Sequence, residues 1–320
     1  MLKVFFTVDV EIWCDGWSGI DEKFPDAFRR YIHGPTPKGD FGLGYQIDVL
    51  NDHGLPGVFF VEPLFSSRFG IGPLEEIVGL VQGGGQEVQL HLHTEWVDEA
   101  MEPLLEDVDG KRQHLRYFSL EEQGTLIAKG LDFMRRAGSA EINAFRAGSF
   151  AFNRETLKAL SGNGIAFDSS YNASLFGLDS GVMTGIPVVE PVQCEGVCEY
   201  PMTVFSDGTG SLRHAQLTAC SFSEIEGLLW KALEEGRNSF VILSHSFELL
   251  NRAKDRPDET VVGRFRKLCS FLDKNRDSFL ACGFHGLEPV GVSEQPPPLA
   301  SPLWRTGVRM MEQALRGRYQ

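Results

Sequence analysis

The chain has 320 residues, of which 42% are hydrophobic and 23% are charged, as in an ordinary globular protein with a large core. Its formal net charge of −14 argues against nucleic acid or an anionic membrane as a partner, because both select for a basic surface. No stretch approaches the roughly 18 apolar residues of a membrane span. The first residues lack the length and cleavage site of an export signal, so we expect a cytoplasmic protein that begins at Met1.

Strand and helix patterns alternate along most of the chain. Short runs rich in β-branched and aromatic residues predict strands over 2–9, 58–61, 87–93, 142–148, 165–170 and 239–246. Apolar positions at helical spacing predict helices over 41–53, 73–82, 119–138, 153–164, 223–236 and 260–275. Ser119 with Glu122 forms a capping box, and Asn153 caps the next helix. This alternation predicts an α/β fold in which parallel strands curl into a (β/α) barrel.

Three regions do not follow this alternation. Residues 97–118 have no clear period and predict a loop over one end of the barrel, and residues 171–215 predict short strands. The Pro-rich segment QPPPLASP ends the core, so we expect a barrel domain over 1–290 and a linker with a C-terminal helix over 291–320. That helix packs on the barrel or docks another element, and packing is the simpler expectation. The six cysteines are scattered, as free thiols are in a reducing compartment.

Polar residues gather at the ends of the predicted strands. Active sites of parallel barrels lie at the carboxyl ends of the strands, so these side chains are expected at one face. They are Asp9, Glu11, His91, His93, Glu95, Arg146, Asp168 and His245.

Asp9 and Glu11 follow the first strand, and a strand that continued would point both to one side. Two carboxylates so close repel each other unless a cation or a proton intervenes. A metal ion would bind one and leave the other as a base. The alternative is a structural role, with the acids capping a helix or pairing with Arg29 or Arg30.

The segment HLHTEW offers metal ligands in two ways. In extended chain His91 and His93 share a face, whereas a helical turn after His91 would bring Glu95 beside it. Imidazole with imidazole or carboxylate suits a borderline ion such as zinc. The alternative is a buried histidine that bonds to a backbone carbonyl.

Two further residues have chemistry that suits an active site. Arg146 can hold a carboxylate ionised in fixed geometry, and His245 can act as a general acid near neutral pH. Asp168 could orient that imidazole or cap the loop that follows it.

The order of these motifs resembles the polysaccharide deacetylases, the NodB-homology group of carbohydrate esterases (family four). The matching segments, over roughly residues 1–285, are 7–10 (TVDV), 85–95 (GQEVQLHLHTE), 146–150 (RAGSF), 168–170 (DSS) and 243–245 (LSH). The resemblance implies a distorted, seven-stranded barrel that removes N-acetyl groups from an amino sugar with the help of a divalent metal ion, with zinc favoured. It also implies that Asp9 is the base, that Arg146 holds it, and that His245 protonates the leaving amine.

The sequence departs from the family pattern at two ligand positions. Val10 stands where the family has a metal-binding aspartate, and Glu95 stands where it has a second histidine. The expected ligands are therefore Glu11, His91 and either His93 or Glu95.

The resemblance does not decide which substrate the protein acts on, or whether the protein is catalytic. The partner it implies is an N-acetylated sugar or oligosaccharide, and Trp13, Trp96, Phe150 and Asp168 are candidates to contact it, although the aromatic rings could equally be core residues. An amide or ureide hydrolase on the same fold, or a metal-free sugar-binding protein, are the alternatives. The oligomeric state is not encoded in any pattern.

Overall fold

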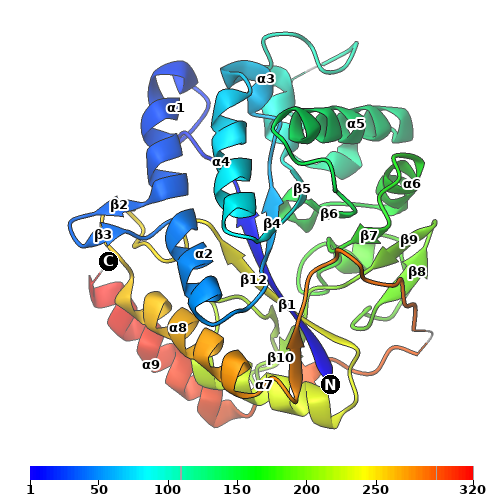
Figure 1. Cartoon of the computed structure of the whole chain (residues 1–320). Coiled ribbons are helices and arrows are strands. Elements are labelled where there is room, and N and C mark those ends of the chain that lie inside the picture. The colour runs from blue at the N-terminus through cyan, green and yellow to red at the C-terminus, as the bar shows by residue number, and fades with distance from the viewer. Residues whose placement is uncertain (109, 293, 320) are drawn as a thin grey trace.

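Seven parallel strands follow one another across the central sheet, an eighth joins it at β1, and the burial of the longest ones explains their apolar sequences. The computed structural model describes residues 1–108, 110–292 and 294–319. In spatial order the parallel strands are β12 (Ser239–His245), β1 (Leu2–Val10), β4 (Val58–Val61), β5 (Glu87–Leu92), β6 (Ala144–Ala147), β7 (Phe167–Asp168) and β9 (Val197–Glu199). The expected α/β fold with a curled parallel sheet is thus confirmed (Figure 1).

The sheet is a distorted half-barrel rather than a closed one. At one edge β8 (Val192–Cys194) pairs antiparallel to β9. The short parallel strand β13 (Phe279–Ala281) pairs with the start of β1 on the side opposite β12, the side on which β4 pairs with the end of β1. Among the strands of the described residues, no pairing joins β8 to β12. The side chains on the two faces of the sheet are covered by separate apolar clusters, of which the larger packs under the helices.

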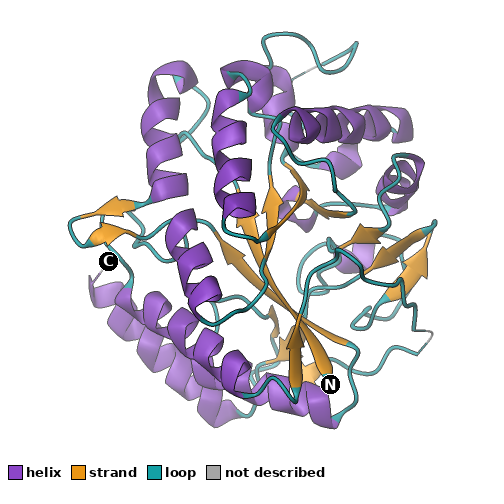
Figure 2. Ribbon diagram, in the orientation of Figure 1, coloured by secondary structure: helices purple, strands orange, loops and turns teal. Residues whose placement is uncertain are grey.

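Helices lie outside the sheet (Figures 1 and 2). They are α1 (Ile20–Phe28), α2 (Leu43–Asp52), α3 (Ser66–Phe69), α4 (Gly72–Gly83), α5 (Leu120–Arg136), α6 (Arg154–Gly162), α7 (Phe222–Glu234), α8 (Glu259–Lys274) and α9 (Leu303–Tyr319). The capping predictions hold: Ser119 and Glu122 form a reciprocal box, and Asn153 accepts from the Thr156 backbone N–H. None of the described helices is long and apolar enough to cross a bilayer.

Helix α1 was not expected. It contains Pro25, its N-cap Gly19 provides no side-chain cap, and it runs into a π-helical turn over Arg29–His33 before the β2–β3 hairpin (Pro35–Thr36, Gly39–Asp40). Such a helix is stabilised by its packing, and no capping residue in the sequence marks where it begins. The segment 97–118 is largely irregular, as expected, with 3₁₀ turns at Thr94–Glu99 and Leu115–Tyr117.

The C-terminal region contacts the rest of the protein through β14 and through α9, which lie on either side of Pro302. Within the expected linker, β14 (Leu299–Ala300) pairs with β10 (Val204–Ser206), which also pairs with β11 (Leu212–His214). From α9, the buried Arg309 donates to Glu224 at 2.8 Å and to Asp207 at 3.0 Å. The helix therefore packs on the barrel, as favoured above. Ser293 and Gln320 lie outside the described residues.

Candidate active site

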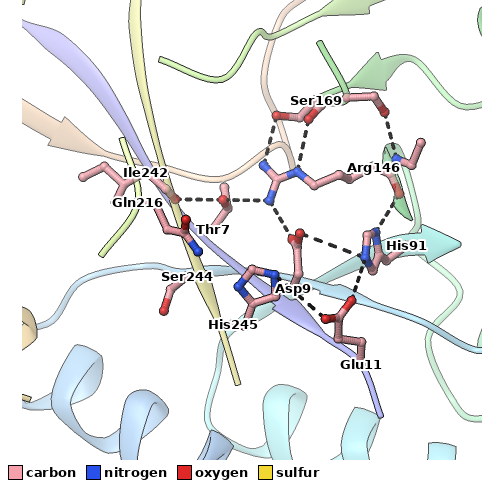
Figure 3. A network of polar contacts seen from close by, with 12 residues as sticks. Thr7, Asp9, Glu11, His91, Arg146, Ser169, Gln216, Ile242, Ser244 and His245 are labelled. Atoms are coloured by element: carbon pink, nitrogen blue, oxygen red, sulfur yellow. Dashed lines mark hydrogen bonds and ion pairs between the residues drawn. The ribbon is translucent and has the colours of Figure 1, made fainter. Parts of the chain in front are cut away.

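The polar residues of β1, β5, β6 and β12 meet at the carboxyl ends of these strands, where parallel barrels place their chemistry (Figure 3). Strand register explains the meeting. Asp9 is the Cα partner of His245 on one side, and His91 is that of Arg146 on the other. Side chains far apart in the sequence therefore project from adjacent positions of one sheet.

Asp9 is held by a buried arginine. The Arg146 guanidinium, with no exposed surface, pairs with Asp9 Oδ1 at 2.6 Å and donates to Thr7 Oγ1 at 2.9 Å. Its other nitrogens donate to the carbonyl and hydroxyl of Ser169, each at 3.1 Å, and its face lies 4.3 Å from the centroid of the Phe60 ring. All three guanidinium nitrogens donate, in four hydrogen bonds, so the Asp9 carboxylate is fixed in one orientation. Its Oδ2 oxygen is free of this pairing and lies 4.0 Å from His91 Nε2.

Glu11, His91 and His93 form a compact buried group. One possible ligand atom from each lies within 4.8 Å of the others. Glu11 Oε2 is 2.6 Å from His93 Nε2 and 3.6 Å from His91 Nε2, and its Oε1 accepts from Trp13 Nε1 at 2.9 Å. Burial alone would raise the pKa of Glu11, but His93 and His91 hold it well below its usual value.

His91 is oriented as a ligand. Its Nδ1–H donates to the Arg146 carbonyl at 2.8 Å, which fixes the tautomer and leaves the lone pair on Nε2. That Nε2 is buried and has no hydrogen-bond partner in the described part of the chain. An unpaired buried acceptor costs about 1–3 kcal/mol, which a bound cation would recover. The observation fits a metal ion held by Glu11, His91 and His93.

Glu95 lies behind His93 and away from Glu11. The strand ends at Leu92, but His93 is still extended, so His91 and His93 share a face before the chain turns at Thr94. Glu95 Oε2 is 3.2 Å from His93 Nδ1, while His93 Nε2 faces Glu11. Burial alone would lower the pKa of His93, yet Glu11 and Glu95 raise it well above its usual value. Of the two alternatives for the third ligand, the geometry favours His93, with Glu95 as its support.

His245 is held by Glu248, a residue that the sequence analysis missed. His245 Nδ1 is 2.8 Å from Glu248 Oε1, and its Nε2 is 3.9 Å from Glu11 Oε1. Despite burial, which alone would lower it, the pKa of His245 rises to about 9, chiefly through the hydrogen bond to Glu248. The imidazole is therefore charged at neutral pH and can donate a proton from Nε2.

Asp168 does not orient His245, whose Nδ1 faces Glu248 instead, and its contact with substrate stays a prediction. It has no exposed surface and is the register partner of Glu199 on β9. Ser170 donates to Asp168 Oδ1 at 2.6 Å, and the Tyr171 backbone N–H donates to Glu199 Oε1 at 3.0 Å. Burial, and then Asp168, raise the pKa of Glu199 well above its usual value, so Glu199 keeps its proton and donates it to Asp168. The pair is a structural carboxyl–carboxylate bond.

This pair makes stability depend on pH. The folded chain holds a proton on Glu199 that the unfolded chain releases, so stability falls as pH rises above the ordinary glutamate pKa. In Glu199→Gln the amide donates to Asp168 without a titrating proton, so we expect a flatter profile and a gain of about 1 kcal/mol or more at pH 8. Urea unfolding at several pH values measures this, with the exposed Glu102→Gln as the control. Parallel profiles for wild type and Glu199→Gln would contradict the shared proton.

The three aromatic candidates differ in exposure. The partly exposed Trp13 bonds to Glu11 and meets the His93 ring edge-on, with centroids 4.8 Å apart, so it lines the site. Trp96 is 1% exposed and packs against Trp17 and Phe69 in the core, which is the alternative role considered for it; its contact with sugar stays a prediction. Phe150 is also buried, and its ring centroid lies 5.8 Å from Arg146 Cζ. Its backbone has a left-handed φ of 57°. Its contact with substrate stays a prediction.

Glu62 was also missed, although the strand-end rule would have found it. It directly follows β4 and is completely buried, and its carboxylate accepts from the backbone N–H groups of Leu64 and Phe65 at 2.7 and 3.3 Å. Burial raises its pKa to about 8, while His93 acts in the opposite direction. It therefore borders the site as a neutral acid at neutral pH.

Comparison with known proteins finds similarity in structure only. No protein-family model and no curated protein matches the chain. Among solved structures, a Mycobacterium smegmatis protein assigned to the polysaccharide deacetylases superposes with a TM-score of 0.54 at 18% identity, over 92% of this chain and 95% of that one. A family 4 carbohydrate esterase from Streptomyces lividans (TM-score 0.43, 11% identity, 92% and 97% covered) and a pseudoenzyme of that family from Bacillus anthracis (0.41, 11%, 87% and 62%) also match. The chain has the fold of the polysaccharide deacetylases.

Proposed function

We propose that this protein is a metal-dependent hydrolase that removes N-acetyl groups from a carbohydrate containing amino sugars. The observation that carries the proposal is the group Glu11, His91 and His93, with the lone pair of His91 Nε2 aimed into it and no partner there. Beside it lie a carboxylate fixed by arginine and a charged histidine, which are the base and the acid that amide hydrolysis requires.

The donor set suits zinc. Two imidazoles and one carboxylate form a three-ligand set that leaves further positions open, as catalytic zinc sites do. The second shell is also present, because His91 is held by the Arg146 carbonyl and His93 by Glu95. When bound, such an ion would polarise the acetyl carbonyl and lower the pKa of the attacking water.

The protein's own groups handle the protons. Asp9 Oδ2, the oxygen that does not pair with Arg146, faces the metal-site group and accepts the proton of the attacking water. Arg146 keeps that carboxylate ionised and still. His245, whose Nδ1 is held by Glu248, gives a proton from Nε2 to the departing amine, so acetate and a free amino sugar are released.

The metal and the reaction are tested together. We expect one divalent ion per chain by elemental analysis of the purified protein, and acetate release from N-acetylated oligosaccharides that a chelator abolishes. An empty protein that takes up no ion on titration would favour the metal-free sugar-binding alternative. Ion binding without acetate release, but with turnover of cyclic ureides, would favour the ureide hydrolase.

The third ligand is tested by two substitutions within the same loop. We expect His93→Gln to weaken metal affinity far more than Glu95→Gln, for which a loss of about 10-fold is ordinary for an outer-shell carboxylate. Competition with a chromogenic chelator measures both. An equal loss, or the reverse order, would make Glu95 the ligand.

A further inference from the structure

A cavity of about 360 Å³ lies beside the candidate active site, in the segment between β12 and α8. Its wall toward the site consists of Phe247 and Glu248. Glu248 bonds to His245 Nδ1 at 2.8 Å, and the Phe247 and His245 rings have centroids 5.4 Å apart. The cavity is therefore one side chain away from the proposed proton donor.

The free charge in this cavity is positive. Glu248 is occupied by His245 and by a bond from Gln216, and Arg316 pairs with Asp258. The two other charged lining residues, Arg252 and Lys254, form no ion pair with any described residue. Lys254 Nζ instead lies over the rings of Tyr31 and Phe247, 4.4 and 5.2 Å from their centroids. Two cations without an ion pair among the described residues stand out in a chain whose net charge is −14, and Asp15 is the carboxylate whose charge reaches Lys254.

The segment that carries both cations is fixed by one asparagine. The Asn251 side chain accepts from the backbone N–H groups of Asp255 and Arg256 at 3.1 and 3.2 Å and donates to the Asp255 carboxylate at 2.9 Å. Asp255 is thereby turned to Asn251 and does not neutralise Lys254. Lys254 itself has a left-handed φ of 56°, a conformation that is unfavourable for a non-glycine residue and that the surrounding bonds must maintain. The backbone that carries both cations is thus fixed before any ligand arrives, and the ring contacts of Lys254 also hold its side chain.

We propose that this cavity binds an anionic group, a phosphate or a carboxylate, carried by the same sugar substrate whose acetamido group lies at Asp9 and His245. The acidic surface of the chain would repel such a substrate elsewhere. Arg252 supplies forked donors that suit either oxyanion, and Lys254 adds a second positive charge. This inference rests on the proposed function, because it names the class of substrate for that site.

Binding is tested without any turnover. Inorganic phosphate is titrated calorimetrically into the metal-loaded wild type, into Arg252→Gln/Lys254→Gln, and into Lys267→Gln/Lys274→Gln, which removes the same charge from exposed positions of α8. We expect the affinity to fall about 10-fold or more in the first variant and to stay at the wild-type value in the second. Equal affinity in all three proteins, or no saturable binding by the wild type, overturns the proposal even if the enzyme is active.

Selectivity separates the two sources of negative charge. Acetate release is compared for a neutral N-acetylated sugar, one that carries a phosphate ester and one that carries a carboxylate. We expect the wild type to favour one charged sugar in kcat/KM, and that preference to shrink about 10-fold in Arg252→Gln/Lys254→Gln. No preference for either overturns the inference alone, whereas no acetate release from any of the three sinks the proposed function.

Discussion

Asp9→Asn is expected to lower the rate of acetate release by about 10²- to 10⁴-fold while the metal content stays at one ion per chain. Asparagine keeps the shape of the side chain and can still accept from Arg146, which lies 2.6 Å from the carboxylate in the wild type, but it cannot take a proton from water. The loss should appear mainly in kcat, because the acetamido group is still bound. Elemental analysis and an acetate assay on the same preparation measure both quantities.

Asp52→Asn provides the matched control for this substitution. Asp52 ends α2 with an exposed side chain far from the site in sequence, so the same change of charge should leave the rate unaltered. Full activity in Asp9→Asn would refute the role of Asp9 as base. Loss of the metal together with activity would instead make Asp9 a ligand. Its Oδ2 lies near enough to the proposed metal site for this, at 4.0 Å from His91 Nε2.

Arg146→Met should destabilise the protein by about 3–5 kcal/mol, the cost of removing one partner of a buried ion pair. Methionine fills much of the same space but leaves Asp9 as an uncompensated carboxylate with 3% of its surface exposed, and it orphans the Ser169 carbonyl. Chemical unfolding of the metal-loaded protein gives the free energy directly.

The double variant Asp9→Asn/Arg146→Met separates charge from packing. Because the asparagine carries no charge that could be left unpaired, the second substitution should cost less in this background than in the wild type. Costs that simply add would show that Arg146 stabilises the barrel by packing on Phe60, at 4.3 Å, rather than through its pair with Asp9.

The fold could be predicted from the sequence because the long strands β1 and β12 are buried and three of the main helices carry their own start signal, at Ser119, Asn153 and Ser221. The site could be predicted in outline for a related reason. Parallel strands bring their carboxyl ends together, so polar residues at those ends had to meet.

The features that the sequence left open or did not reveal depend on how the chain runs after each strand ends. Whether His93 or Glu95 faces Glu11 depends on one extended residue, His93, before the chain turns. Asp168 has the pattern of a site residue, but its environment is set by Glu199, on a short strand that carries no clear period. Glu248 lies in a turn three residues beyond His245, where no periodicity indicates which side chain returns to the ring.

The buried Arg309 has a consequence for synthesis of the protein. Asp207, directly after β10, and Glu224, on α7, are buried against α9, with side chains 3% and 0% exposed, and the cation that compensates them is Arg309 of α9. In a nascent chain whose α9 has not yet emerged from the ribosome, both carboxyl groups would have to stay exposed to water or be protonated. We therefore expect the face of α7 and β10 that carries these acids to complete its packing only after α9 has left the ribosome.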